Sequence, residues 1–358
     1  MKVSVVIPMY NSAAFIEKTL RCVLAQDFQD FEVVIVNDGS TDGSSEVVRS
    51  IGDPRIRVID KPNTGVSDTR NVGNAAARGE YIASLDSDDY WYPDHLSEAM
   101  AFFEEYPEIV WYGAEQYSLP YDGVPPDSTR PSRRFGKRIF FVDGKPFIHS
   151  SSMVFRRDIV EKCGAYPSDM AYFEDWMFQG QIGTEFPIVG TNDRVTSIYN
   201  RGRPGSATMI DTEDRTEDYR RVLHSLEYGV ERNRVKSPTW VLSISRLFFR
   251  TMLFRHSCEE VLSAVNEFRS LNGWIRTFRW RCFVKSAYAL SDERMHDWLV
   301  VMVKKGFRGR LYDSRSIFRK CGAWCCFKWL AIVFLYVSRG VADSVQDKLE
   351  RIGMHKKY

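Results

Sequence analysis

The chain has 358 residues, of which 44% are hydrophobic, 14% aromatic and 27% charged, and its formal net charge is +2. This composition is typical of a folded globular protein with one large domain or two ordinary ones, and it excludes a disordered chain. The charge is uneven, because residues 1–100 carry 9 Lys and Arg against 16 Asp and Glu, whereas residues 301–358 carry 13 against 4.

The first hundred residues alternate between short β-branched runs and helical patterns. Strands are predicted at 2–8, 31–38, 55–60 and 81–86, and helices at 12–26 (with Ser12 as N-cap), at 43–51 and within 64–79. This alternation predicts βαβ units and a mostly parallel sheet with helices on both faces. Ligands of such sheets bind at the carboxyl ends of the strands. The polar residues expected at that edge are Tyr10, Asn11, Asp38, Asp60 and Asp86 to Asp89.

The rest of the chain divides into a loop-rich part and a helical part. Residues 117–135 are rich in Pro, Ser and Asp and predict a long loop or a flap over a ligand. Residues 150–164 return to a strand followed by a helix. Beyond about residue 210 the Gly and Pro residues thin out, and long helical patterns predict an all-helical C-terminal region.

Cysteine usage and the absence of a long apolar run bear on the compartment. Seven cysteines include no C-x-x-C pair, which argues against a disulfide framework or a zinc site and fits a reducing cytosol. The N-terminal apolar run breaks at Pro8 and is too short for a signal peptide. No uninterrupted apolar run reaches the roughly 20 residues of a membrane span; the nearest, 321–337, contains Lys328. We therefore expect a cytoplasmic protein.

Three carboxylates follow the strand at 81–86 within four positions: Asp86, Asp88 and Asp89. Their mutual repulsion must be offset by whatever they bind. Carboxylate oxygens suit Mg²⁺ or Mn²⁺, which take one or two protein carboxylates and complete their shell with phosphates and water. The alternative is a set of turn and N-cap aspartates ahead of Pro93. The motif alone does not decide between them.

Four segments together resemble a known family. They are the opening V-x-I-P-x-Y-N, the V-N-D-G-S-T-D turn, the R-N-x-G segment and the D-S-D-D run. Their order and separations are similar to those of the family 2 glycosyltransferases, which have the GT-A fold and use nucleotide-activated sugars. The resemblance covers roughly residues 1–210. It implies a GT-A catalytic domain there, a mixed sheet flanked by helices, followed by the helical region 211–358.

The resemblance implies a nucleotide-sugar site at the sheet edge, with Mn²⁺ or Mg²⁺ as cofactor. The ring of Tyr10 could stack on a uracil face, and the Asp38 carboxylate could accept the base imide N–H, unless it only starts the Asp-Gly turn. Asp86 would face the ribose or sugar and, with Asp88, hold the metal. The further donor-binding residues implied are Pro8, Asn11, Asp68 and Arg70.

The second half of the resemblance supplies the catalyst. The acidic pair Glu174–Asp175, in "YFEDWMF", implies an inverting transfer in which one carboxylate takes the proton of the acceptor hydroxyl. We assign the base to Asp175, with Glu174 as its neighbour; the reverse assignment and a purely structural acidic helix start are the alternatives. Many relatives carry Arg-x-His-x-x-Ser near the diphosphate, where this chain has no His. Here Arg201, Arg203 and Ser206 could cover the phosphates.

Other residues near the expected cleft are given weaker roles. His149 is read as a wall residue rather than a catalyst. Aromatic faces pack on sugar rings, so one of Trp91, Trp111 and Trp176 is expected in the site, and the others in the core.

The C-terminal segment from Cys321 is apolar and aromatic first, then amphipathic, with basic residues on both sides. It suits a helix in the interface of an anionic membrane; a core helix, a solvated basic face and a homodimer contact are the alternatives. A membrane contact would place the protein on the cytoplasmic face of the inner membrane. A nucleic-acid partner, which the basic charge alone would also suit, is not expected.

The sequence therefore predicts a metal-dependent, inverting glycosyltransferase. Its expected donor is a UDP-sugar, and its expected acceptor is a glycan or lipid-linked glycan of a bacterial surface polysaccharide. A non-catalytic sugar-nucleotide-binding scaffold subunit is the rival, although it would have no need of a base. A nucleotidyltransferase would predict a Gly-rich loop after the first strand, where this chain has "PMYNSAAF".

Overall fold

The computed structural model describes residues 1–120, 130–142, 148–170, 172–201 and 215–235, with isolated positions between 241 and 268. The chain divides into two compact units, Met1–Ser243 and Ile244–Tyr358. All elements described below belong to the first unit. The boundary at residue 210 between a catalytic domain and a helical region stays a prediction.

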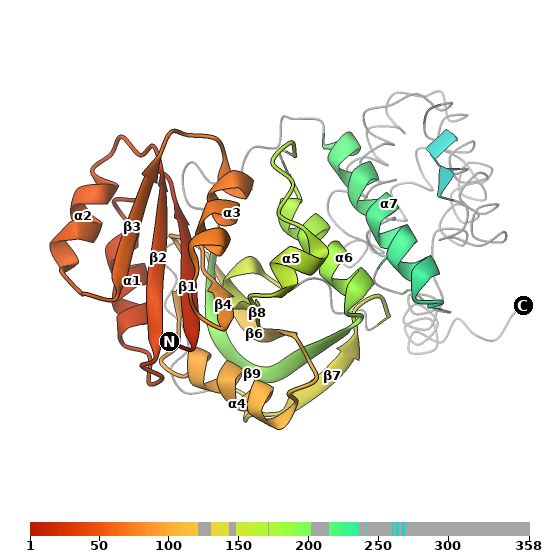
Figure 1. Ribbon diagram of the computed structural model, residues 1–358, viewed down its shortest axis with the longest axis horizontal. Coiled ribbons are helices and arrows are strands. Elements are labelled where there is room, and N and C mark those ends of the chain that lie inside the picture. The colour runs from red at the N-terminus through yellow and green to blue at the C-terminus, as the bar shows by residue number, and fades with distance from the viewer. Residues whose placement is uncertain are drawn as a thin grey trace, which may run out of the picture. The chain divides into compact units, whose positions relative to one another are not determined.

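The first unit is built on a mixed sheet, with helices connecting its strands (Figure 1). The strands are β1 (Val3–Met9), β2 (Phe31–Asp38), β3 (Ile56–Lys61), β4 (Tyr81–Ser84), β5 (Tyr90–Trp91), β6 (Trp111–Pro120), β7 (Phe135–Ile139), β8 (Met153–Arg156) and β9 (Ile188–Arg201). The helices are α1 (Ile16–Leu24), α2 (Ser44–Ile51), α3 (Val66–Ala76), α4 (His95–Glu105), a 3₁₀ turn (Ser150–Ser152), α5 (Ile159–Cys163), α6 (Glu174–Glu185) and α7 (Thr216–Arg232).

The sheet has two halves with different strand directions. Its order is β3-β2-β1-β4-β8-β6-β9-β5, and β7 also pairs with β9. The first four strands run parallel, β8 is antiparallel to both β4 and β6, and β6 runs parallel to β9. The predicted mixed α/β sheet is therefore confirmed, and the parallel part is its N-terminal half.

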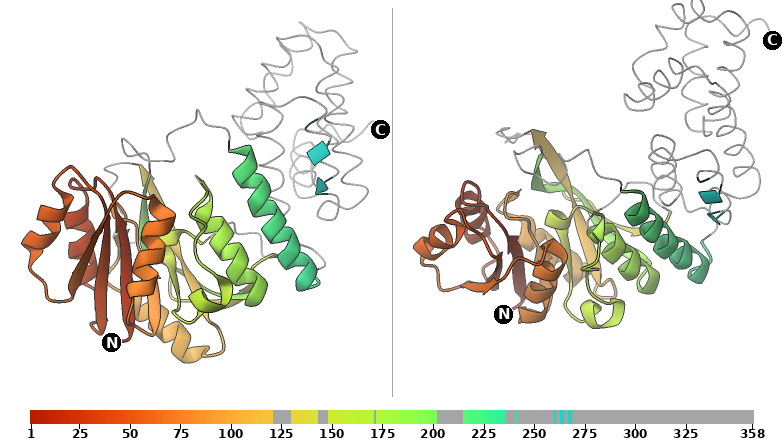
Figure 2. Two further views of the ribbon diagram at one scale, coloured as in Figure 1. Left: turned by 45° about the horizontal axis from the view of Figure 1, so that its top comes forward. Right: turned by 90° about the horizontal axis from the view of Figure 1, so that it is seen from above.

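Helices cover both faces of the parallel half (Figures 1 and 2). Every residue of β1 and β2 is buried, as expected of strands that are covered on both sides. Side chains of α1, α2 and α4 share one core cluster with alternate residues of β1. Helix α3 packs closely on the other face, since a Cβ at Gly73 would lie 2.4 Å from Cγ1 of Val6. The glycine of the R-N-x-G motif thus allows the helix to approach the sheet.

The N-cap predicted at Ser12 and part of the loop predicted at 117–135 were wrong. Helix α1 begins at Ile16 rather than Ser12, because Ser12 is buried and its Oγ donates to the carbonyl of Tyr10 instead of capping the helix. The loop predicted at 117–135 is strand at both ends, because β6 continues to Pro120 beside β9 and β7 starts at Phe135. Its central residues, 121–129, lie outside the described residues.

The predicted long helix after residue 210 is confirmed as α7, which packs on α6. A Cβ at Gly180 of α6 would lie 3.2 Å from Cδ2 of Leu226 in α7, so the helices approach closely. Within the described part of the chain, no helix is long and apolar enough to cross a membrane. The aromatic and basic segment predicted to bind membrane or a second copy lies outside the described residues.

Candidate functional site at the carboxyl edge of the sheet

The parallel strands β1, β2 and β4 end at one edge, which brings together the residues that follow them. Tyr10 follows β1 and is 48% exposed, whereas Pro8 is buried inside β1 opposite Val36. Asn11 has a positive φ of 46°, and its Oδ1 accepts the backbone N–H of Thr41 at 2.9 Å. Pro8 and Asn11 therefore shape the strand end and the adjacent turn, and Tyr10 offers an exposed ring.

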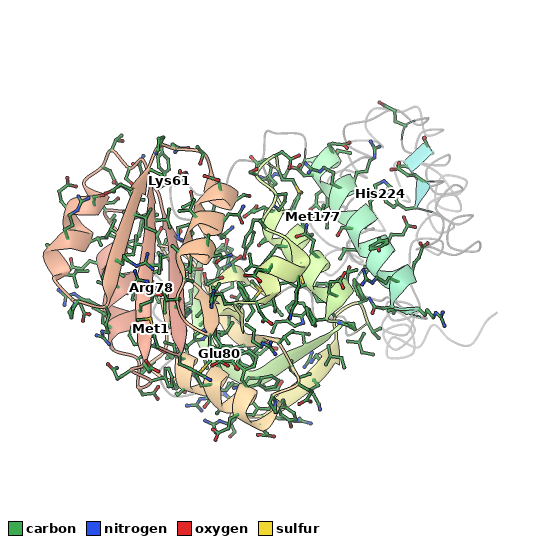
Figure 3. The ribbon with its side chains drawn as sticks, viewed as in Figure 1. Met1, Lys61, Arg78, Glu80, Met177 and His224 are labelled. Carbon is green, nitrogen blue, oxygen red and sulfur yellow. The ribbon has the colours of Figure 1, made fainter. Side chains whose placement is uncertain are left out.

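Asp38, at the end of β2, lies in a cluster with a lysine that sequence reasoning missed. Lys61 is the register partner of Asp38 on β3, and its Nζ donates to the Asp38 carboxylate and lies 3.1 Å from Oδ2 of Asp68. Figure 3 shows Lys61 at the edge where α3 begins. Burial acts to lower the pKa of Lys61, but the hydrogen bonds to both carboxylates outweigh it and raise the pKa. The contact follows from the register of β2 and β3, because paired residues of neighbouring parallel strands point to the same face of the sheet.

Asp38 also holds the start of α3. Its carboxylate accepts the backbone N–H groups of Thr64, at 2.9 Å, and Gly65, at 3.0 Å. Asp68 lies in the first turn of that helix, and hydrogen bonds from Thr64 and Lys61 lower its pKa. The carboxylates predicted to serve the nucleotide thus also organise the loop beneath it.

Arg70 of α3 is the centre of the site. Its side chain is only 8% exposed; Nη2 donates to Oδ1 of Asp86 at 2.8 Å and Nη1 to Oε1 of Glu174 at 2.6 Å. Asn71, the next residue, exchanges two hydrogen bonds with the backbone of Tyr166. The R-N pair therefore ties the Asp-x-Asp strand end to the acidic start of α6, although 104 positions separate Arg70 from Glu174.

The three aspartates after β4 differ in their burial. Asp86 and Asp88 are half-buried, whereas Asp89 is fully buried and accepts the N–H of Asn200, at 2.9 Å, and the hydroxyl of Ser151. Burial and the charges of Asp88 and Asp86 raise the pKa of Asp89. Asp89 thus connects this turn to β9.

The carboxylates of Asp86 and Asp88 fit a hard divalent cation with few protein ligands. Among the described residues, no three His, Cys, Asp or Glu side chains are grouped as a metal cage. Asp86 and Asp88 supply only carboxylate oxygens. Such a set suits Mg²⁺ or Mn²⁺ that completes its shell with phosphate and water, and it does not suit a structural zinc ion.

Helix α6 begins with Glu174 and Asp175, after a residue in an unusual conformation. Phe173 has φ of 63°, a region that bulky residues rarely adopt and that costs about 1–3 kcal/mol. Burial raises the pKa of Asp175 to about 8, with a further contribution from Glu174 and an opposing one from Arg70. The Ser150 hydroxyl lies 3.4 Å from its Oδ2. Asp175 is therefore a carboxyl group that takes up a proton near neutral pH.

The weaker predictions separate clearly. His149 is half-buried; the loss of solvent lowers its pKa to about 4, and its Nδ1 accepts the N–H of Ser151 at 3.2 Å. This arrangement fits a neutral wall residue. Trp91 and Trp111 are buried in the core. Trp176 is half-buried beside Asp175, and its ring centroid lies 4.9 Å from that of Phe173 at a tilt of 39°, so it is the tryptophan adjacent to the acidic pair.

The residues predicted to cover the phosphates are only partly described. Arg201 is exposed at the end of β9. Arg203 and Ser206 lie outside the described residues.

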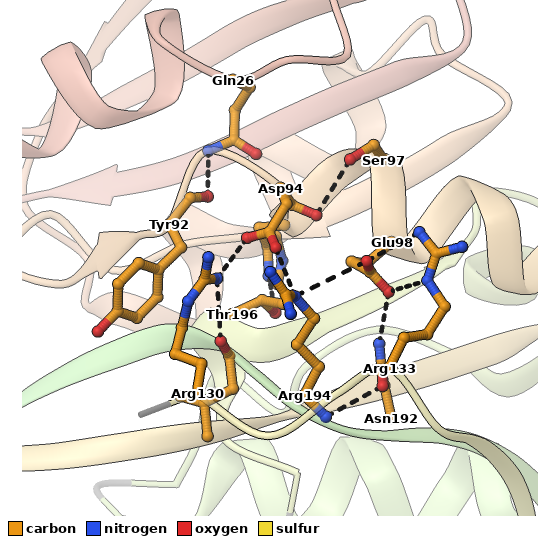
Figure 4. A network of polar contacts seen from close by, with 12 residues as sticks. Gln26, Tyr92, Asp94, Ser97, Glu98, Arg130, Arg133, Asn192, Arg194 and Thr196 are labelled. Atoms are coloured by element: carbon orange, nitrogen blue, oxygen red, sulfur yellow. Dashed lines mark hydrogen bonds and ion pairs between the residues drawn. The ribbon is translucent and has the colours of Figure 1, made fainter. Parts of the chain in front are cut away.

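A second polar network joins α4 to β9 and to the chain after residue 129 (Figure 4). Asp94 accepts from Arg130 and from Arg194, both at 2.6 Å. Glu98 accepts two hydrogen bonds from Arg133, at 2.7 and 2.8 Å, and one from Asn192. This network fixes the segment that leads into β7.

Comparisons with known proteins bear on the family and the fold of this chain. The profile of the family described as "Glycosyl transferase family 2" matches residues 4–164. The uncharacterized glycosyltransferase EpsJ of Bacillus subtilis (strain 168) is 47% identical over 221 residues, which cover 58% of this chain and 63% of that protein. Chondroitin synthase of Pasteurella multocida (strain Pm70) is 45% identical over 103 residues, or 28% of this chain and 11% of that protein. The chain thus spans less than two thirds of these relatives.

Among solved structures, S. aureus TarS 1-349 in complex with UDP-GlcNAc has 21% sequence identity and a TM-score of 0.59. The likeness covers 87% of this chain and 93% of that one. At this identity it supports the fold alone, which is the predicted mixed sheet with flanking helices.

Proposed function

This chain belongs to glycosyl transferase family 2, and from that membership we propose that it moves a sugar from a UDP-sugar to a hydroxyl group of a growing glycan, with inversion at the anomeric carbon. The proposed product is a bacterial surface polysaccharide, such as capsule, O-antigen or lipooligosaccharide. The names of relatives support this: TarS has been crystallised with UDP-GlcNAc, and chondroitin synthase is a polysaccharide synthase.

The observation that carries the proposal is the position of Arg70 between Asp86 and Glu174. One buried guanidinium holds the strand end proposed to face the donor next to the helix start proposed to activate the acceptor. An in-line displacement needs both groups in one cavity, on opposite sides of the reacting carbon. A nucleotide-binding scaffold would not need the second group.

Within the acidic pair, the contacts favour Asp175 as the base. Glu174 is already ion-paired with Arg70 at 2.6 Å, so its carboxylate is engaged by that guanidinium. Asp175 has a pKa raised to about 8 by burial and by Glu174, which is close to the value that favours proton transfer at neutral pH. In the proposed step the acceptor oxygen attacks the anomeric carbon, its proton passes to Asp175, and the bond to the nucleotide diphosphate breaks.

The donor is proposed to lie along the carboxyl edge of the sheet. Tyr10 would stack on the base, and Asp38 would accept the imide N–H. Asp88 and Asp86 would hold a Mn²⁺ or Mg²⁺ ion, which when bound neutralises charge on the departing diphosphate. Arg70 orients Asp86 for this role rather than reaching out to a phosphate, because its own side chain is buried.

The proposal is tested with the full-length protein, UDP-sugars and Mn²⁺. UDP with Mn²⁺ should raise the melting temperature, and Asp88→Asn should remove that stabilisation. Asp175→Asn should keep the stabilisation by UDP and reduce sugar transfer by about 10²–10⁴-fold. Where the acceptor is unknown, the rate at which the enzyme hydrolyses the donor is measured instead. Asp169→Asn is the matched control. Asp169 lies shortly before α6, is exposed, and pairs with Arg221 of α7.

Two results would contradict the proposal separately. Stabilisation by no nucleotide, with or without metal, would remove the donor site. Transfer that survives Asp175→Asn would leave the donor site in place and show that the base has been assigned wrongly.

A further inference from the structure

Lys61 lies under the residue proposed to read the nucleotide base, and neither the sequence motifs nor the relatives assign it a role. Its side chain is 12% exposed, and that of Asp38 is 5% exposed. Besides Asp38 and Asp68, its ammonium group meets the hydroxyl of Thr64 and lies 3.4 Å from that of Thr69. An ammonium group this enclosed is held in one position, unlike most surface lysines.

The hydrogen bonds of Asp38 can be counted. An ionised carboxylate offers about four acceptor positions on its two oxygens. Lys61 and the N–H of Thr64 use Oδ1, and the N–H of Gly65 uses Oδ2. These three donors, all within the described part of the chain, leave about one acceptor position, which lies on Oδ2.

We propose that Lys61 is a positioning residue for base selection: it orients the Asp38 side chain so that one acceptor position on Oδ2 is left for the base, which favours uracil over cytosine. The inference rests on the proposed function, in which Asp38 reads the base. Uracil carries a hydrogen on N3 and donates it to that position. Neutral cytosine has a bare N3, which repels a carboxylate oxygen.

Loss of the Lys61 ammonium should change the orientation of the Asp38 side chain. Asp38, at the end of β2, and Asp68, in the first turn of α3, would then lack the cation between them, and one acceptor position of Oδ1 would open. An Asp38 side chain that is no longer held in place would accept the N3 hydrogen of uracil less well, whereas neutral cytosine has no such hydrogen to donate. Uracil binding should therefore weaken, and the preference over cytosine should shrink.

The experiment measures dissociation constants of UDP and CDP for the full-length protein in Mn²⁺. The two nucleotides share ribose, diphosphate and metal, so the CDP/UDP ratio isolates the base. Wild type should bind UDP more tightly. Lys61→Met should weaken UDP binding by about tenfold, as expected for loss of a charged hydrogen bond, and weaken CDP binding less. Lys61→Gln, which keeps a donor without the charge, serves if the methionine variant does not fold.

The matched control is Arg49→Met, which breaks the exposed Arg49–Asp60 pair beside the same strand and should leave both constants unchanged. Equal losses for UDP and CDP in the Lys61 variants, or an unchanged ratio, would overturn the inference and make Lys61 a structural residue only. If wild type binds neither nucleotide, the proposed donor site itself fails, so the two failures are distinguishable.

Discussion

The two polar networks of the first unit, Met1–Ser243, differ in their balance of charge. In the α4 network, two carboxylates, Asp94 and Glu98, meet three arginines, and every one of these side chains is paired. At the carboxyl edge of the sheet, among the described residues, carboxylates outnumber cations. The carboxylates are Asp38, Asp68, Asp86, Asp88, Asp89, Glu174 and Asp175, and the cations are Lys61 and Arg70.

The pKa values follow this difference. Burial opposes ionisation of Asp94, but hydrogen bonds from Arg130 and Arg194 outweigh it and lower the pKa. At the sheet edge, burial and neighbouring carboxylates raise the pKa of Asp175 and of Asp89. The first network is complete and holds elements together. The second has an excess of negative charge, which is what a site needs in order to bind a divalent cation and to take up a proton.

The largest effect is expected at Arg70, which contacts both Asp86, a proposed metal ligand, and Glu174, the neighbour of the proposed base. Arg70→Met should leave Asp86 and Glu174 without their shared cation, and removal of one partner of a buried ion pair costs about 3–5 kcal/mol. Urea unfolding followed by circular dichroism measures this loss. Sugar transfer by the folded fraction should also fall, because both acids lose their orientation. A variant that keeps wild-type stability would show that Arg70 is not the central link.

Arg194→Met is the corresponding change in the α4 network. Asp94 keeps Arg130 as a partner, so the loss should be about 1.5–3 kcal/mol, the range for one hydrogen bond to a charged group. Transfer per folded molecule and UDP binding should remain unchanged. A selective loss of transfer in this variant would mean that the α4 network serves the reaction as well, and the comparison between the two networks would break down.

The parallel half of the sheet could be predicted from sequence because its signals are local. β2 spans the predicted residues 31–38, and the other strands and helices of this half differ by a few residues at their ends. Continuous β-branched runs indicate strands buried on both faces. The N-cap error arose because the Ser12 hydroxyl contacts the carbonyl of Tyr10 and the hydroxyl of Ser87 instead of a helix N–H.

The site was predictable only in part, for a related reason. Family motifs indicated which residues gather at the edge, and the structure brings Asp86, Arg70 and Glu174 into contact. The motifs could not show that Arg70 binds two carboxylates rather than an exposed ligand, because its partners come from different parts of the chain. Lys61 was missed since a single lysine at a strand end carries no pattern, although its register with Asp38 places them side by side.

The pH dependence should reveal the raised pKa of Asp175. In the proposed mechanism the carboxylate of Asp175 is the active base, so the transfer rate should rise with pH up to about 8, and fall about tenfold per unit below it. Stability should change in the opposite direction. The folded protein keeps the proton of Asp175 up to about pH 8, whereas the unfolded chain releases it near 3.8, so stability falls as pH rises across this window.

Asp175→Asn is the control for both curves. It should remove this contribution to the pH dependence of the melting temperature while the fold is retained. A transfer rate that is already independent of pH between 6 and 8 would contradict the raised pKa, and with it the electrostatic distinction between the two networks.

The smallest effect is expected at an exposed ion pair, which calibrates the other changes. Arg21 and Glu17 pair at 2.6 Å across one turn of α1, with side chains 72% and 54% exposed. Because water screens such pairs, Glu17→Gln should cost no more than about 0.5 kcal/mol, and the difference should vanish in high salt. Urea unfolding at two salt concentrations measures it. If Glu17→Gln cost as much stability as Arg194→Met, the stabilisation by an ion pair would not depend on its burial. The α4 network would then contribute no more to stability than exposed ion pairs do.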